Sequence, residues 1–188
     1  MLKKALDYSH SLLKECVIAG DLVIDATVGN GHDTILLASL VGPNGSVIGF
    51  DIQEQAIQKT SEKLLLTGLN QQVHLHQVGH QFIGDYLPSQ KQVSAAIYNL
   101  GYLPGGDKSI TTLKESTIES IKQLIPHLRI GALVVIVVYS GHPTGQEEKD
   151  ALLGYLSSLD QKDYAVLQYG FINQKNQPPF VVAIEKKK

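Results

Sequence analysis

The sequence of 188 residues predicts an α/β fold in which a mostly parallel sheet carries helices on both faces. Strand-like runs alternate with helical patterns along the chain, as in proteins built from strand–helix–strand units. The runs are continuously apolar, which is typical of strands buried on both faces; residues 132–139 contain no charged side chain. The last two predicted strands are joined only by residues 173–179, too few for a crossover helix, so this pair is predicted to be antiparallel.

Each element follows from local pattern and from the residues that interrupt it. Apolar residues at helical spacing predict helices, Gly68 ends one of them, and Gly131 precedes the most apolar strand. The predicted helices cover residues 2–18, 32–41, 53–67, 111–128 and 146–159. The predicted strands cover residues 22–27, 46–50, 73–78, 93–98, 132–139, 164–171 and 180–184.

Composition narrows the class of protein. Hydrophobic residues make up 43% and charged residues 18%, the balance of a globular protein, and the length predicts a single domain over residues 1–188. Cys16 is the one cysteine, which excludes an internal disulfide framework, and we expect no metal site. Charged residues interrupt residues 1–20, and no apolar stretch is long enough to span a bilayer, so we expect a cytoplasmic protein without a membrane partner.

Residues 21–34 are the most informative stretch. An apolar run ends at Asp25, the turn Gly29-Asn30-Gly31 follows, and a helical pattern then begins. A strand that breaks into a glycine turn before a helix is how α/β proteins hold nucleotide-like ligands. The turn lacks the third glycine of G-x-G-x-x-G, and there is no phosphate loop. Asp25 and Asp33 would repel a pyrophosphate and would suit a ligand that carries positive charge.

A second acidic signal ends the next strand. Asp51 follows Gly31 by 20 residues, where a carboxylate is placed to accept hydrogen bonds from a ribose diol, with Gln53 beside it. Proteins that bind NAD and proteins that bind S-adenosylmethionine both use this device. Two structural roles stay open: Asp51 as the N-cap of the following helix, and Asp25 as a buried carboxylate that caps the glycine turn.

The third signal is Asn99-Leu-Gly-Tyr102, at the end of an apolar strand. An amide oxygen can accept hydrogen bonds from an amine, and a tyrosine can pack on a flat base. The segment is also a Gly/Pro turn. Because parallel strands end at one edge of a sheet, five segments are predicted to meet there: Asp25–Asp33, Asp51–Gln53, Gly79–His80, Asn99–Asp107 and Tyr139–His142.

The segment from Asp25 to Thr34, with Asp51 after the second strand, resembles class I S-adenosylmethionine-dependent methyltransferases. The resemblance implies their Rossmann-like, seven-stranded, mostly parallel sheet with an antiparallel last strand. Asn99-Leu-Gly-Tyr102 sits where amino-methylating members carry (Asn/Asp)-Pro-Pro-(Tyr/Phe), with Leu100-Gly101 in place of the two prolines. Three segments are similar to a small bacterial family often labelled "putative rRNA methylase": residues 99–108, residues 139–142 with Glu147, and residues 173–180.

That family is understood as the tRNA 5-(aminomethyl)-2-thiouridine methyltransferase. The resemblance therefore implies S-adenosylmethionine as cofactor, the tRNA anticodon stem-loop as partner, and N-methylation at the wobble uridine. On the cofactor side, Asp25 or Asp33 would hold the ammonium group and Asp51 the ribose. The full cofactor-binding set is Asp25, Gly29, Asn30, Gly31, Asp33, Asp51, Gln53, His80 (beside the adenine), Asn99 and Gly101.

On the acceptor side, the resemblance implies four catalytic residues. Asn99 would line the methyl-transfer channel, Tyr102 would lie beside the target uridine, and Tyr139 and His142 would form the opposite wall. His142 is a candidate proton acceptor, because an imidazole titrates near neutrality, and equally a turn residue before Pro143.

Other functions stay open at this point. One is methylation of another RNA or of a small molecule, favoured by the net charge of −2 and the lack of a separate RNA-binding domain. Others are a non-enzymatic nucleotide-binding module and an NAD-dependent dehydrogenase, which the missing third glycine disfavours. If RNA binds, phosphate contacts would come from some of Lys108, Lys114, Lys122, Arg129 and Lys175. The helix over 2–18 and the loop over 173–180 are candidate surfaces for a homodimer.

Overall fold

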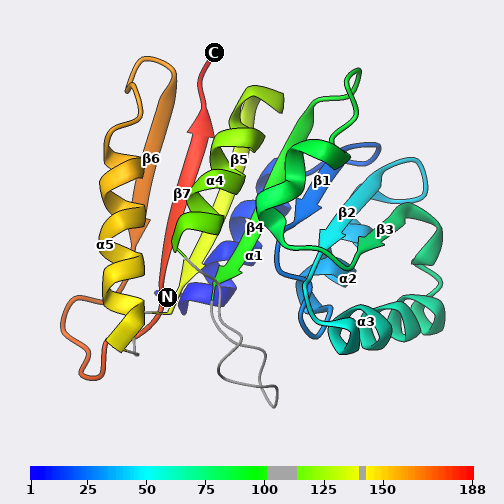
Figure 1. Ribbon diagram of the computed structural model, residues 1–188, viewed down its shortest axis with the longest axis horizontal. Coiled ribbons are helices and arrows are strands. Elements are labelled where there is room, and N and C mark those ends of the chain that lie inside the picture. The colour runs from blue at the N-terminus through cyan, green and yellow to red at the C-terminus, as the bar shows by residue number, and fades with distance from the viewer. Residues whose placement is uncertain (101–113, 140–142) are drawn as a thin grey trace.

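The computed structural model describes residues 1–100, 114–139 and 143–188. Within these ranges, seven strands form one mixed sheet in the order β3-β2-β1-β4-β5-β7-β6 (Figure 1). The strands are β1 (Leu22–Asp25), β2 (Ser46–Phe50), β3 (Val73–His76), β4 (Val93–Leu100), β5 (Leu128–Val138), β6 (Tyr164–Tyr169) and β7 (Phe180–Lys186).

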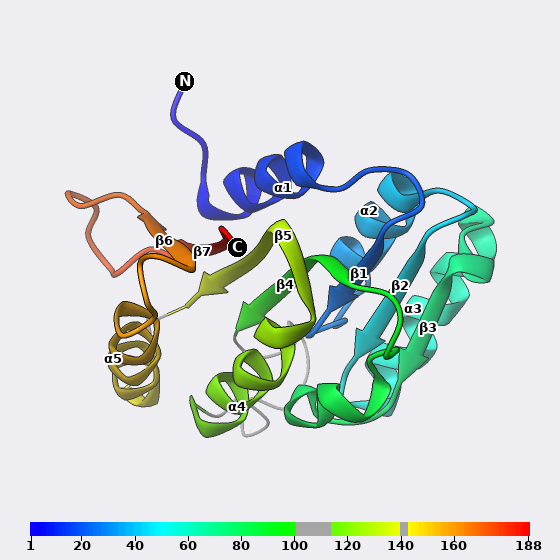
Figure 2. The same cartoon turned by 90° about the horizontal axis from the view of Figure 1, so that it is seen from above.

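The helices cover both faces of the sheet, as the apolar strands require. Figure 2 shows α1 and α2 on one side of the sheet and α4 and α5 on the other, and the packing of Leu64 places α3 on the side of α1 and α2. The helices are α1 (Ala5–Cys16), α2 (His32–Val41), α3 (Glu54–Thr67), α4 (Lys114–Leu124) and α5 (Pro143–Ser157).

Alternating side chains of each central strand feed two separate hydrophobic clusters. In β5, Ile136 packs with α4 and α5, whereas Val135 and Val137 pack with α1 and α2. In β4 the same alternation turns Tyr98 toward α4 and Ile97 toward α1 and α2. Because successive residues of a strand point to opposite faces of the sheet, each residue near a strand end faces either α1 and α2 or α4 and α5.

The predicted sheet is confirmed. β1, β2, β3, β4 and β5 are mutually parallel, while β7 is antiparallel to β5 and to β6. The register of β7 pairs Phe180 with Val138 of β5 and Lys186 with Tyr164 of β6. The β6–β7 connection therefore lies at the carboxyl edge of the parallel strands, since β6 runs in their direction.

Some predicted boundaries differ from the structure. The helix predicted to reach residue 128 ends at Leu124, because Pro126 lacks the N–H that an α-helix needs; a 3₁₀ turn over Ile125–His127 leads directly into β5. Between β3 and β4 the chain forms 3₁₀ turns over His80–Tyr86, where no helix is predicted. The helix predicted from 146 begins at Pro143, a residue suited to a first helical turn.

Candidate functional site

The carboxyl ends of the parallel strands bring the predicted acidic and amide side chains to one edge of the sheet. Asp25 ends β1, Asp51 follows β2 directly, and Asn99 is the second-to-last residue of β4. Tyr139 follows β5 at the same edge. Hydrogen bonds join several of these residues, so the predicted meeting of strand ends is confirmed for the residues that the structure describes.

The glycine turn is shaped by its contact with α3. Gly29 and Gly31 have positive φ angles of 51° and 78°, which glycine adopts without strain. A Cβ atom on Gly31 would lie 2.6 Å from Thr60 Oγ1, so the close approach itself requires glycine. The Thr60 hydroxyl donates to the Gly29 carbonyl at 3.3 Å, and Lys63 Nζ donates to the Asn30 carbonyl at 2.7 Å.

Asp51 links the glycine turn to the start of α3. Its Oδ2 accepts the Gly29 N–H at 2.8 Å, and its Oδ1 accepts the Gln53 N–H at 2.9 Å. Gln53 itself is the N-cap of α3, so the interpretation of Asp51 as the N-cap is wrong. A carboxylate oxygen can accept two hydrogen bonds, and Asp51 is only partly buried. Both of its oxygens can therefore still accept a hydrogen bond from a ligand hydroxyl.

Asp25 is completely buried and is used within the turn. Its Oδ1 accepts the Thr27 N–H at 3.1 Å, and its Oδ2 accepts the Thr34 hydroxyl at 2.6 Å. Burial, and next the charge of Asp33, raise the pKa of the Asp25 carboxyl to about 7. Asp25 therefore has the turn-capping role that the sequence left open, and its negative charge is reduced near neutral pH.

Asp33 joins three elements. In the first turn of α2, its Oδ1 lies 2.6 Å from His10 Nε2 of α1, and its Oδ2 accepts the Asn99 Nδ2–H of β4 at 3.2 Å. The Asn99 N–H in turn donates to Thr27 Oγ1 at 2.7 Å. Burial, and next the charge of Asp33, raise the pKa of the Tyr139 phenol.

Sequence reasoning missed His10. Its helix was predicted for its apolar positions, and one polar side chain among them gave no signal of a contact 23 positions along the chain. The period of two in β4 explains the meeting: Asn99 follows Ala95 and Ile97 onto the face that α1 and α2 cover.

His80 is buried between structural partners. Its Nδ1–H donates to the Ala26 carbonyl at 3.0 Å, and its Nε2 lies 3.5 Å from Ser116 Oγ. The ring packs edge-on against Tyr98, and burial lowers the pKa of His80 to about 4. His80 therefore ties the segment after β3 to the end of β1 as a neutral imidazole, and its contact with an adenine stays a prediction.

The remaining predicted residues do not all gather at this edge. Gly101, Tyr102, His142 and Lys108 lie outside the described residues, and so does the side chain of Lys114. Arg129 lies at the amino end of β5, on the far edge, where it donates to the Cys16 carbonyl at 3.1 Å. Lys175 belongs to the β6–β7 connection at the carboxyl edge. Lys122 lies on α4, with its Nζ 5.6 Å from the centroid of the Tyr155 ring. The described members of the predicted phosphate-binding set are therefore not gathered in one place.

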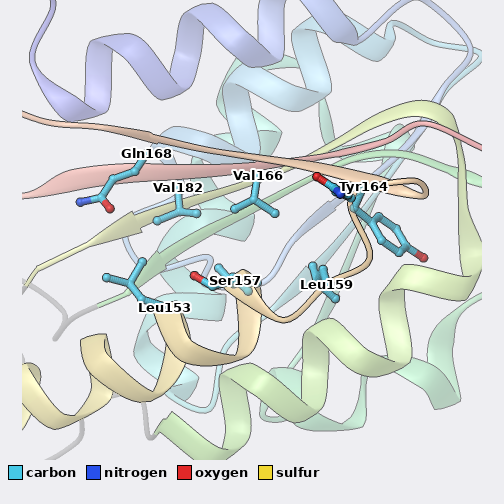
Figure 3. A pocket seen from close by; sticks show the side chains of 9 residues that line it. Leu153, Ser157, Leu159, Tyr164, Val166, Gln168 and Val182 are labelled. Atoms are coloured by element: carbon cyan, nitrogen blue, oxygen red, sulfur yellow. The ribbon is translucent and has the colours of Figure 1, made fainter.

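The described part of the chain offers no group of three His, Cys, Asp or Glu placed to hold a metal ion. Nor does it contain a helix with the length and apolar character needed to cross a membrane. A separate groove of about 370 Å³ lies between α5 and β6 (Figure 3) and contains none of the predicted site residues. It is lined by Leu153, Leu156, Ser157, Leu159, Gln161, Tyr164, Val166, Gln168 and Val182.

The sheet order, the glycine turn and the acidic strand ends together define a class I S-adenosylmethionine-dependent methyltransferase. A family model described as "Putative rRNA methylase" matches residues 47–185, and the chain belongs to that family.

Similar proteins agree with this assignment. The chain is 35% identical over 192 residues to the "tRNA (mnm(5)s(2)U34)-methyltransferase, chloroplastic" of Arabidopsis thaliana, covering 98% of this chain and 70% of that protein. A crystal structure of a "putative rRNA-methylase" from Clostridium thermocellum has 46% identity and a TM-score of 0.96, with 99% of both chains covered. A "putative methyltransferase" from Streptococcus mutans in complex with SAH has 41% identity and a TM-score of 0.89 over 99% of both chains.

Proposed function

We propose that the chain methylates the primary amine of 5-aminomethyl-2-thiouridine at the tRNA wobble position, acting through one domain over residues 1–188. The observation that carries the substrate is the match over 98% of the chain to a relative whose name states the methylated product, mnm(5)s(2)U at position 34. The same proposal includes binding of the tRNA through its anticodon stem-loop and association of the chain into a homodimer. Ala5 and Leu13 of α1 pack within the chain, while Leu6 is exposed, so this helix and the loop over 173–180 remain the candidate dimer surfaces.

The residues at the carboxyl edge fit S-adenosylmethionine, which carries a sulfonium and an ammonium group. Asp33 and Asp51 supply carboxylates, and Gly31 lets the backbone come close where any side chain would collide with Thr60. Asp33 would hold the ammonium group and Asp51 the ribose hydroxyls. Of the two residues predicted to hold the ammonium, Asp33 is favoured because Asp25 is completely buried and burial raises its pKa to about 7, which reduces its negative charge near neutral pH.

The cofactor, when bound, supplies a methyl group that is already activated by its sulfonium, so the protein has mainly to align the reactants and exclude water. Asn99 Nδ2 is committed to Asp33, which leaves Asn99 Oδ1 as the acceptor for an amine N–H. Such a bond would orient the lone pair of the neutral amine toward the methyl group. Tyr102 would pack on the uridine, with Tyr139 and His142 on the opposite wall.

The test uses purified protein, labelled S-adenosylmethionine and tRNA from cells that lack the modifying activity. Mass spectrometry of the wobble nucleoside should show conversion of the aminomethyl to the methylaminomethyl form. An unchanged aminomethyl peak would overturn the proposed substrate. A parallel reaction with the free nucleoside separates an RNA substrate from a small-molecule substrate, since we expect methylation only within tRNA.

A further inference from the structure

Helix α1 contributes one polar side chain to the site. His10 Nε2 lies 2.6 Å from Asp33 Oδ1, and the side chains of His10 and Asp33 are 25% and 7% exposed. Asn99 occupies the other oxygen of the same carboxylate. Two partners on two different elements therefore fix both the position and the plane of the Asp33 carboxylate.

We propose that His10 is a positioning residue for the cofactor, holding Asp33 in the orientation that accepts an ammonium group. The inference rests on the proposed function, in which Asp33 binds the ammonium of S-adenosylmethionine. A carboxylate has about four acceptor sites. With one used by His10 and one by Asn99, sites remain for a ligand in a direction that the two protein bonds determine.

The chemistry of histidine suits this task. An imidazole offers an N–H in a fixed direction on a short side chain, so its bond to Asp33 sets where the carboxylate oxygens point. In this arrangement the Nε2–H of His10 points to Asp33 Oδ1. The bonds from His10 and Asn99 restrict rotation of the Asp33 carboxylate and leave its other acceptor sites for the ammonium group.

The contact is not what keeps α1 on the sheet. The helix packs through the buried side chains of Ala5, Ser9 and Leu13, and Tyr8 stacks on Tyr169 with ring centroids 4.0 Å apart. Removal of the imidazole therefore leaves these packing contacts in place. This separates a positioning role from an anchoring role and makes the inference testable.

The experiment measures ligand affinity by calorimetry without RNA, using two probes. S-adenosylhomocysteine carries the ammonium group, and 5′-methylthioadenosine lacks it. We expect His10→Ala to lower the affinity for S-adenosylhomocysteine about tenfold, which corresponds to the loss of one charge-assisted hydrogen bond. The affinity for methylthioadenosine should change by no more than about twofold. His10→Gln, which keeps a donor, should restore most of the affinity. His74→Ala, at an exposed histidine of β3, is the matched control.

Each outcome decides the question. Equal weakening of both probes, or unchanged binding of S-adenosylhomocysteine to His10→Ala, would overturn the inference. A loss of kcat at saturating S-adenosylmethionine with unchanged KM would also overturn it, because a positioning role for the cofactor raises KM. If the wild-type protein binds neither probe, the proposed function fails instead, which keeps the two failures distinguishable.

Discussion

Gly31 offers a direct test of how the glycine turn is built. Its φ of 78° costs a non-glycine residue about 1–2 kcal/mol. An added Cβ would lie 2.6 Å from Thr60 Oγ1 and 2.7 Å from Thr60 Cγ2, and Thr60 is fully buried, so the overlap adds about 1–3 kcal/mol. We expect Gly31→Ala to lower the free energy of unfolding by about 3 kcal/mol, measured by urea denaturation.

A double-mutant cycle separates the two costs. Thr60→Ala removes both of the nearest atoms, so in the Gly31→Ala/Thr60→Ala protein the backbone strain remains and most of the overlap is gone. The two substitutions should therefore couple favourably by about 1–3 kcal/mol. Gly68→Ala is the matched control, since its φ is 70° with no atom near the added Cβ, and it should show the strain alone. Additive costs in the cycle would refute the role given to Thr60.

Three further predictions concern charge, strain and ligand binding. Because the pKa of Asp25 is raised from 3.8 to about 7, the folded state retains a proton that the unfolded state loses, so stability falls as pH rises from about 4 to 7. Asp25→Asn should flatten that fall in thermal melts, and an unchanged pH profile would contradict it. Gln177→Gly relieves a φ of 44° and should raise the free energy of unfolding by about 1 kcal/mol in urea denaturation; a lower value would speak against strain there. Asp51→Ala should lower the affinity for S-adenosylmethionine at least tenfold in calorimetry, and an unchanged affinity would remove Asp51 from the cofactor site.

The parts of the site that sequence predicted are those encoded locally. The glycine turn, Asp25 and Asp51 lie at strand ends that apolar runs mark clearly, and parallel pairing then brings those ends to one edge. Their roles were harder to assign. Asp25 and Asp33 look alike in the sequence, and only their burial and partners separate a turn-capping carboxylate from one joined to α1 and β4.

Other features depended on contacts between distant segments. The His10–Asp33 bond needs the packing of α1 against the sheet, which no local pattern encodes. The 3₁₀ turns over His80–Tyr86 lack helical periodicity, and they are held from outside by the Ala26 carbonyl and by Gln123, whose side chain bonds to Gly84 and to the Gln81 carbonyl. Tertiary contacts stabilise this segment, so propensity could not predict it.

The position of β7 has a consequence for the order in which the sheet can be completed. β7 lies between β5 and β6, although β6 precedes it in the chain. During synthesis β6 therefore emerges before the strand that connects it to the sheet, and until residues 180–186 are released β5 has an unpaired edge and β6 has no partner. Such edges invite pairing with other chains. A nascent chain arrested just before β7 should thus be more prone to aggregation, and more in need of a chaperone, than one arrested after it.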